Sequence, residues 1–300
     1  MEQNSMTALV SAFARAYHAE RVEGEKVFDD FLAARLLTRE ERENIARSMA
    51  GGVSFFNPGF SGGAEEALEW VVNRQLAPSP LGRAAFAEGA LEEAAARGAG
   101  QYLLLGAGLD SFALRQPPWA RALEIFEMDL PASSRNKAAR IAAAGLSLPE
   151  NLHLLGADLS APDSLDALRA HPRFRPDAPA FVGLLGFSYY LRREALSALL
   201  ARLCALLPPG SRFAMDYPTR GESGQMERQR QLAAGAGEDM RAAYGPGEMS
   251  ALLGACGLRV LRDLSPEEIT AQFFSAHNRA HPSSPIFAAE RVNYCLAEKE

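Results

Sequence analysis

The stretch from Tyr102 to Asp110 reads YLLLGAGLD, and it decides the fold. Its apolar first half is typical of a strand buried in a parallel sheet, and Gly106 marks the end of that strand. Glycine there lets the backbone turn sharply, and the amides that open the next helix then face a ligand. A tight turn without any ligand is the alternative interpretation. The third glycine of a dinucleotide site is missing, because Ser111 occupies its place.

Apolar runs of the same kind recur along the rest of the chain. Four of them end at a glycine or an aspartate, namely 124–128 at Asp129, 152–157 at Asp158, 181–185 at Gly186 and 212–215 at Asp216. Helical patterns lie at 133–144, 163–170 and 192–207, and two final strands are expected at 258–261 and 292–296. Strands that alternate with helices predict an α/β fold, here with seven strands and helices on both faces of the sheet.

The segment before this pattern carries helical spacing and no convincing strand. Apolar residues fall at helical intervals in three places, 9–17, 28–35 and 68–76, and clusters of glycine and proline separate them. We therefore expect an N-terminal helical cap over residues 1–98 and an α/β core over residues 99–300.

The composition is that of an ordinary globular protein, with 48% hydrophobic and 23% charged residues among 300. The net charge is −6, and an acidic surface repels phosphate backbones and anionic lipids, so we expect neither nucleic acid nor a membrane as partner. No signal peptide, membrane-spanning run or zinc-binding spacing is evident, and the three cysteines lie far apart. We expect a cytoplasmic protein without a metal, whose oligomeric state the sequence leaves open.

Ligands of open α/β sheets bind beyond the carboxyl ends of the strands, which draws attention to two aspartates. Asp129 lies about 20 residues after the glycine turn, where an acid that accepts both ribose hydroxyls belongs. Capping of the helix that starts near Pro131 is its alternative role. Asp158 is placed to accept from an adenine amino group while Leu159 packs on the ring, and capping of the next helix is again the alternative.

Three further features carry weaker signals. The adjacent Tyr189 and Tyr190 follow the fourth strand, and they either line an acceptor pocket or open the next helix as half-buried rings. Arg83 precedes the first strand and could clamp a carboxylate bidentately, although a lone arginine is more often a surface residue. His277 and His281 lie four residues apart without an evident third ligand, so we interpret them as non-metal residues.

Together these residues resemble the bacterial class I methyltransferases related to leucine carboxyl methyltransferases, the polyketide-type O-methyltransferases. The similarity runs along nearly the whole chain, and the pairing of GAGLDS at 106–111 with FEMDLP at 126–131 is more specific than either part. Further matches lie at 8–18, 27–30, 185–191 and 292–296. The resemblance implies a Rossmann-like seven-stranded sheet with an antiparallel last strand, an N-terminal helical cap and S-adenosylmethionine as cofactor.

The resemblance also implies a cofactor site. The turn at 106–110 would hold the methionine portion, Arg83 its carboxylate, Asp129 the ribose and Asp158 the adenine. Many relatives carry a glutamate where Leu185 stands, so we expect no cofactor contact through a carboxylate at this position. The same difference sets this chain apart from the enzymes that act on protein C-termini. The expected cofactor-binding residues are Arg83, Gly106, Ala107, Gly108, Asp110, Asp129, Leu130, Asp158, Leu159 and Gly186.

We therefore expect an enzyme that moves a methyl group from S-adenosylmethionine to an oxygen of a small-molecule acceptor. A carboxylate is already ionised near neutrality and needs no base, whereas a hydroxyl benefits from one. The candidates for that catalytic role are His18, Tyr17 and Tyr190, and the segment 219–243 is where acceptor specificity should vary. The alternatives are a nicotinamide-dependent oxidoreductase, for which a catalytic set is missing, and a cofactor-binding protein without catalysis.

Overall fold

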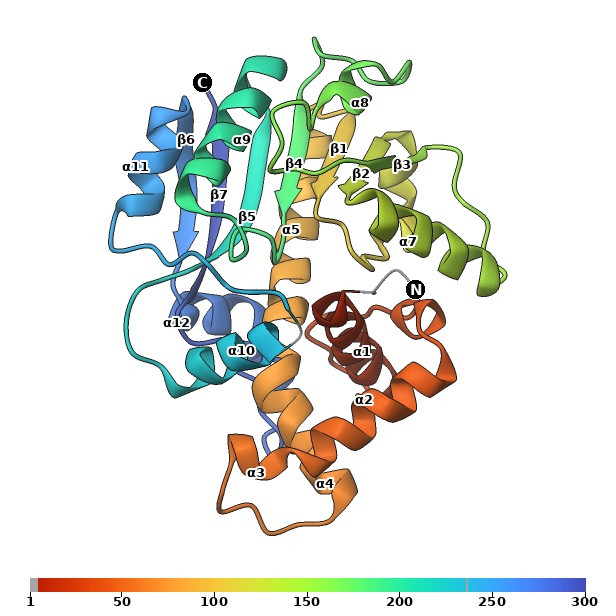
Figure 1. Cartoon of the computed structure of the whole chain (residues 1–300), viewed down its shortest axis with the longest axis vertical. Helices are drawn as coiled ribbons and strands as arrows, with labels where there is room; N and C mark the ends of the chain where they lie inside the picture. Colours follow the sequence, from red (N-terminus) through yellow and green to blue (C-terminus); the bar gives the residue numbers. More distant parts are fainter. Residues whose placement is uncertain (1–4, 236) are drawn as a thin grey trace.

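A computed structural model describes residues 5–235 and 237–300, and within them lies a seven-stranded sheet. Its strand order is β3-β2-β1-β4-β5-β7-β6 (Figure 1). The pairings from β3 to β5 are parallel, and β7 runs antiparallel to both of its neighbours. The strands are β1 (Gln101–Leu105), β2 (Glu124–Asp129), β3 (Leu152–Gly156), β4 (Ala180–Leu184), β5 (Arg212–Pro218), β6 (Leu258–Leu264) and β7 (Val292–Lys299). The predicted seven-stranded, Rossmann-like sheet with an antiparallel last strand is confirmed.

The register of the sheet brings the predicted strand ends together. Leu105 of β1 lies opposite Met128 of β2, and Asp129 of β2 lies opposite Gly156 of β3. The glycine turn therefore emerges beside Asp129, and the chain after β3 emerges beside both. This common edge is where the sequence predicted a ligand.

Helices cover both faces of the sheet, which explains why its inner strands are continuously apolar. All five residues of β1 are buried. Leu103 and Leu105 pack with α9 (Arg193–Leu206) and α11 (Glu248–Ala255), whereas Tyr102 and Leu104 pack in the core that includes α5 (Pro78–Ala96). The other helices after β1 are α6 (Phe112–Arg115), α7 (Pro131–Ala143), α8 (Asp166–Arg169), α10 (Gly224–Gly235), α12 (Pro266–Ile269) and α13 (Ser275–Ala280).

The N-terminal segment is helical, as expected, and the described part of it holds no strand before β1. Its helices are α1 (Met6–Arg21), α2 (Arg39–Gly51), α3 (Val53–Phe56), α4 (Ala64–Val71) and α5. In Figure 1, α1 lies below the sheet, at the end toward which the β4 arrow points, and α2 to α4 lie further out. The long α5 runs from that region onto the sheet and contacts β4, β5 and β7. A boundary near residue 98 between cap and core remains a prediction.

Two predicted helices are shorter than expected. The stripe at 28–35 yields only a 3-10 turn at Ala33–Leu36, because the Asp30 carboxylate accepts from the Ala33 amide at 3.1 Å and fixes a turn there. The pattern at 163–170 yields only α8, and Pro172 follows closely, which disfavours helix in the residue before it.

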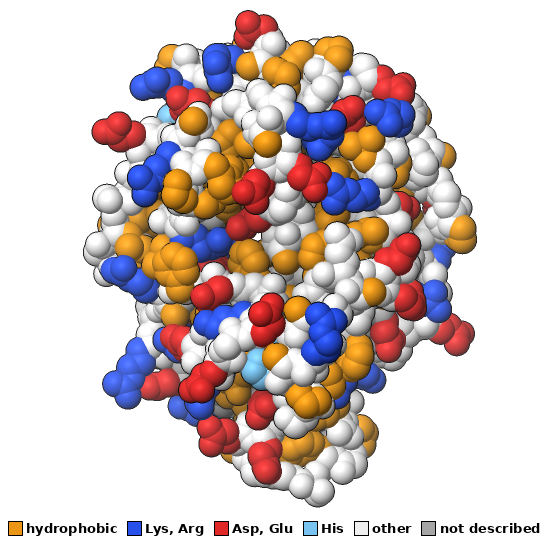
Figure 2. Space-filling view, turned by 180° about the vertical axis from the view of Figure 1, so that it is seen from behind, with side chains coloured by type: hydrophobic (Ala, Val, Ile, Leu, Met, Phe, Trp, Pro, Cys, Tyr) orange, Lys and Arg blue, Asp and Glu red, His pale blue; other side chains and the backbone are white. Residues whose placement is uncertain are grey.

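The surface gives no sign of one dominant charge on the face drawn in Figure 2, where acidic and basic side chains are interspersed with hydrophobic ones. Among the residues that the structure describes, no helix combines the length and the hydrophobicity that crossing a membrane requires.

Candidate functional site

A cavity of about 1030 Å³ opens at the carboxyl ends of β1, β2, β3 and β4, and we call it the main cavity. Its wall combines the strand ends with the start of α1 and with the chain at 229–241. Its volume lies at the upper end of the ~300–1,000 Å³ typical of small-molecule sites, so it has room for two ligands side by side. All ten residues predicted to bind the cofactor line it, namely Arg83, Gly106, Ala107, Gly108, Asp110, Asp129, Leu130, Asp158, Leu159 and Gly186.

The turn after β1 requires glycine at two positions. Gly106 has a φ of +70°, and a Cβ there would lie 2.5 Å from the Phe187 ring. Gly108 has a φ of +49°, and a Cβ there would lie 3.4 Å from the Cβ of Ala8 on α1. The turn thus exposes bare backbone to the cavity between packed neighbours, an arrangement that suits close approach by a ligand.

Asp129 joins this turn to the start of the next helix. Its Oδ2 accepts from the Gly108 amide at 2.7 Å, and its Oδ1 accepts from the Leu130 amide at 2.7 Å. The helix α7 begins without any side-chain cap, so Asp129 does not cap it in the usual way. Each oxygen of a carboxylate has two lone pairs, so Asp129 retains acceptor capacity toward the cavity.

Asp158 and Asp110 are both carboxylates held in local turns. Oδ1 of Asp158 accepts from the amide and the hydroxyl of Ser160 at 3.0 and 2.7 Å, and these hydrogen bonds lower the pKa of Asp158. Oδ1 of Asp110 accepts from the Phe112 amide at 2.8 Å. Leu159 next to Asp158 is buried, whereas Leu130 next to Asp129 is half exposed. The two leucines therefore offer apolar surface next to an acceptor.

Arg83 reaches the main cavity from α5. Its Nη2 donates to the Ser11 hydroxyl at 3.3 Å, and its Nη1 lies 3.5 Å from Oδ2 of Asp216. A Cβ at Gly186, whose φ is +66°, would lie only 2.2 Å from the same Nη1. Glycine at 186 is therefore what admits the guanidinium to the strand end.

Asp216 is the important residue that the sequence did not single out for the site. Its side chain is 1% exposed, and besides facing Arg83 it accepts from the Gly186 amide at 2.6 Å and from the Tyr189 hydroxyl at 2.9 Å. Burial and the Asp216 charge both raise the pKa of Tyr189. Burial lowers the pKa of Arg83, but Asp216 and the neighbouring tyrosines together outweigh it and raise that pKa. The one feature of the sequence that could have identified Asp216 is an aspartate within the buried strand segment 212–217.

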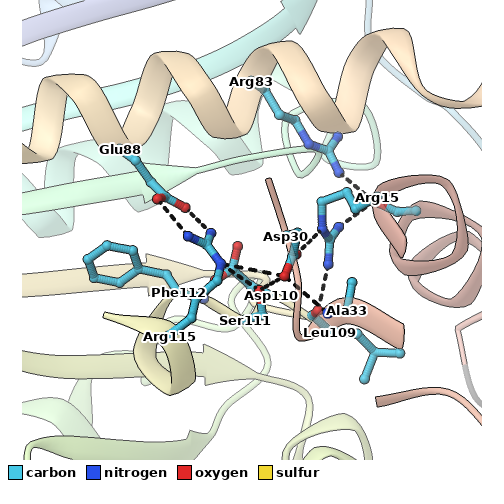
Figure 3. Close-up of polar contacts among 11 residues, drawn as sticks. Arg15, Asp30, Ala33, Arg83, Glu88, Leu109, Asp110, Ser111, Phe112 and Arg115 are labelled. Atoms are coloured by element: carbon cyan, nitrogen blue, oxygen red, sulfur yellow. Dashed lines mark hydrogen bonds and ion pairs between the residues drawn. The ribbon is translucent and has the colours of Figure 1, made fainter. Parts of the chain in front are cut away.

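A buried ionic network supports the glycine turn from the side of the cap, as Figure 3 shows. Arg15 of α1 pairs with Asp30 at 2.8 Å and donates to the Leu109 carbonyl at 2.7 Å. Asp30 also accepts from the Ser111 hydroxyl at 2.5 Å, and Arg115 donates to that hydroxyl at 3.0 Å. Although burial would raise the pKa of Asp30, Arg15 and Arg115 outweigh it and lower that pKa. The cap and the turn are thereby held as one unit.

The three residues predicted for catalysis are not brought together. Tyr190 lines the main cavity, and burial raises the pKa of its hydroxyl. Tyr17 and His18 are absent from the cavity wall. His18 is fully buried, its Nε2 accepts from the Val27 amide at 3.1 Å, and burial lowers its pKa to about 3. A buried imidazole with so low a pKa accepts a proton poorly, so we no longer propose His18 as the base. Tyr17 is set aside as well, because it does not line the main cavity.

The histidine pair at 277 and 281 also has a structural setting. Nδ1 of His277 and Nε2 of His281 lie 3.0 and 3.1 Å from the Glu25 carbonyl, and the His277 ring lies 5.2 Å from that of His18. No cluster of metal-ligating side chains is present in residues 5–235 and 237–300.

Comparison with known proteins connects this geometry to a family. Residues 8–204 match the leucine carboxyl methyltransferase family. The Bacillus subtilis (strain 168) protein YktD, itself a predicted S-adenosyl-L-methionine-dependent methyltransferase, is 37% identical and is aligned over 99% of both chains. A protein of Parafrankia sp. (strain EAN1pec) with the same description is 35% identical over 70% of this chain and 62% of its own.

Solved structures agree on the fold. A DUF574 family protein from Streptomyces avermitilis superposes with a TM-score of 0.59, 16% identity and 97% coverage of both chains. A Thermobifida fusca protein described as a methyltransferase superposes with a TM-score of 0.56, 17% identity, and coverage of 99% of this chain and 96% of its own.

The family match sets aside the nicotinamide-dependent and non-catalytic alternatives. The family match agrees with two features of the chain: Ser111 stands where a dinucleotide site has its third glycine, and the main cavity lies at the strand ends. The chain belongs to the leucine carboxyl methyltransferase family and is an S-adenosylmethionine-dependent methyltransferase.

Proposed function

We propose that this enzyme methylates an oxygen of a small-molecule acceptor, and that the oxygen belongs to a carboxylate. When bound, S-adenosylmethionine supplies the methyl group. In this proposal Arg83 holds the methionine carboxylate, the turn at 106–110 holds the rest of the methionine, Asp129 holds the ribose, and Asp158 with Leu159 holds the adenine.

The residues present fit such a cofactor. The bare backbone at Gly106 and Gly108 admits close approach, and Asp129 keeps a lone pair on each oxygen for two hydroxyl donors. Arg83 uses only one nitrogen toward Ser11 and one toward Asp216, so its planar fork retains donors for a carboxylate.

The observation that carries the choice of acceptor is the chemistry of the cavity wall. Among the described residues that line the main cavity there is no histidine, lysine or cysteine. The wall does contain Arg135 and Arg241, outside the predicted cofactor residues. A carboxylate is ionised at neutral pH, needs no proton removed and is attracted by guanidinium groups, so this wall suits it better than a hydroxyl.

Methyl transfer needs the acceptor oxygen in line with the methyl carbon and the sulfur. Positioning of this kind can contribute roughly 7–11 kcal/mol toward lowering a barrier. We assign that task to Tyr190, Arg241 and the start of α1, because they line the main cavity outside the predicted cofactor residues.

A hydroxyl acceptor is the second candidate, and one residue favours it. Glu238 lines the main cavity and accepts a hydrogen bond from the Thr7 hydroxyl, so its carboxylate could act as a base. Tyr190 is a poor base, because burial raises its pKa and its phenolate is scarce at neutral pH.

The pH dependence of methyl transfer separates the two candidates. The rate of S-adenosylhomocysteine release should be flat from about pH 6 to 8 for a carboxylate acceptor, and Glu238→Gln should leave that profile flat. A rate that falls as the pH drops, and whose fall disappears in Glu238→Gln, would establish a hydroxyl acceptor instead.

We also place the reaction in the cytoplasm, which the free state of Cys204, Cys256 and Cys295 supports.

A further inference from the structure

A second cavity of about 660 Å³ lies beside the main cavity, and we call it the arginine cavity. It lies at the start of α9 and of α11, with the chain at 239–244 between them. Four guanidinium groups and three carboxylates border it, from Arg192, Arg193, Arg220, Arg241, Glu194, Asp239 and Glu248. The excess of positive charge is notable in a chain whose net charge is −6.

The charges in the arginine cavity are unequally satisfied. Glu248 pairs with Arg220 at 2.6 Å and with Arg193 at 3.9 Å, and it also accepts from the Gly245 amide at 3.1 Å. Within the described ranges, the side chains of Arg192 and Arg241 make no ion pair or hydrogen bond with protein groups. Two guanidinium groups are therefore free to bind a ligand here, and Glu194 and Asp239 are the acids that oppose them.

A buried hydroxyl without a partner lies on Tyr244, a residue that borders the arginine cavity. Tyr244 is 1% exposed, and its hydroxyl has no hydrogen-bond partner in the structure. Burial raises the pKa of Tyr244 to about 12, and the charged groups that act on it, Arg193, Glu194 and Glu248, all border the arginine cavity. A neutral phenol at this position is a donor, and buried donors in native proteins are normally satisfied.

The backbone adds to the positive potential. The helix α9 has 14 residues and α11 has 8, and neither start carries a side-chain cap hydrogen bond. The amides of an uncapped helix start attract anions, and the acids in these first turns, Glu194 and Glu248, offset part of that attraction.

The arginine cavity adjoins the main cavity. Asp239 and Arg241 border both cavities. The amides of Arg241 and Ala242 donate to the Tyr189 carbonyl at 2.7 and 3.2 Å, which fixes this part of the chain against the tyrosine pair of the main cavity.

We propose that the arginine cavity binds an oxyanion, carboxylate or phosphate, carried by the methyl acceptor at the end remote from the methylated group. Arg192 and Arg241 bind the oxyanion, and Tyr244 borders the cavity beside them. This inference rests on the proposed function, because it makes the acceptor a molecule with two acidic groups, one in each cavity.

The first experiment uses inorganic phosphate as the probe. Calorimetric titration at constant ionic strength should show binding to the wild type that weakens about tenfold in Arg192→Gln and in Arg241→Gln. Arg230→Gln is the matched control, since Arg230 is exposed on α10 and borders neither cavity. Phosphate that fails to bind, or that binds Arg192→Gln as tightly as the wild type, would overturn the proposal.

The second experiment identifies where the oxyanion comes from. In the presence of S-adenosylhomocysteine, straight-chain dicarboxylates of increasing length should bind more tightly than the matching monocarboxylates, and Arg192→Gln should abolish the gain. Phosphate binding without any gain for dicarboxylates at any length would show a site for free anions and overturn the acceptor assignment.

Failure of the proposed function gives a different pattern. If no carboxylate is methylated, the response of phosphate binding to these variants still stands, and S-adenosylhomocysteine should bind Arg192→Gln as it binds the wild type.

Discussion

Asp129 connects the turn after β1, the start of α7 and the proposed ribose site, so replacing it tests the account of cofactor binding. Both of its oxygens accept backbone amides at 2.7 Å, and each has one lone pair left for a ribose hydroxyl. Hydrogen bonds to a charged group contribute ~1.5–3 kcal/mol each. Losing two of them in Asp129→Ala removes ~3 kcal/mol even at the lower end, which corresponds to roughly 100-fold weaker binding.

Asp129→Asn gives the graded comparison. Asparagine keeps the size and one acceptor oxygen, so we expect about tenfold weaker binding of S-adenosylhomocysteine rather than 100-fold. The assay is calorimetric titration with S-adenosylhomocysteine, with thermal unfolding followed by circular dichroism on the same samples. Asp177→Asn is the matched control, because Asp177 is exposed and borders no described cavity.

One result would refute this reasoning. If Asp129→Ala lowered the melting temperature but bound S-adenosylhomocysteine as tightly as the wild type, Asp129 would only hold the Gly108 and Leu130 amides.

Three further predictions follow from single contacts. Arg83→Lys keeps a positive charge near Asp216 but lacks the planar fork, so S-adenosylhomocysteine should bind about tenfold more weakly; equal affinity in a titration would remove Arg83 from the site. Gly186→Ala places a Cβ 2.2 Å from Nη1 of Arg83 at a φ of +66°. It should therefore lower both the affinity for S-adenosylhomocysteine and the melting temperature, and a variant that matched the wild type in both would contradict the packing of Arg83 against Gly186. His18 has a folded pKa of about 3 against an ordinary 6.5, so the unfolded chain takes up a proton at a higher pH than the folded protein does. The free energy of unfolding, measured by urea titration, should therefore fall below about pH 6.5 by up to ~1.4 kcal/mol per pH unit. His18→Gln should flatten that slope, and an unchanged slope would contradict the low pKa of His18.

Much of the fold followed from the alternation of apolar runs and helical patterns. The strand ends at Gly106, Asp129 and Asp158 were predictable, because parallel strands buried on both faces read as short apolar runs and terminate at a shared edge. The residues that reach the main cavity from these ends were predictable for the same reason.

What the sequence did not reveal depends on which side chains meet across the chain. Asp216 was marked only as the end of a strand, since nothing local shows that Arg83, 133 positions earlier, would lie 3.5 Å away. The network of Arg15, Asp30 and Arg115 joins distant segments in the same way.

His18 illustrates a different limit. Helical spacing places it on α1 but cannot say which face of α1 the rest of the cap covers. Its burial against Val27 and His277, together with the position of Tyr17 outside the main cavity, arises from tertiary packing. Of the three catalytic candidates, Tyr190 lines the main cavity, as does its neighbour Tyr189.

The central claim is that the methyl group reaches a carboxylate oxygen. The most direct measurement supplies S-adenosylmethionine labelled with carbon-13 in its methyl group, with a small-molecule extract of cells as the source of acceptor, and follows the label by NMR. We predict a labelled methyl ester that mild base hydrolyses to labelled methanol, formed by the wild type and not by Asp129→Ala. A label that survives base on nitrogen, sulfur or carbon would contradict the account, and a base-stable methyl ether would keep oxygen as the acceptor but rule out the carboxylate.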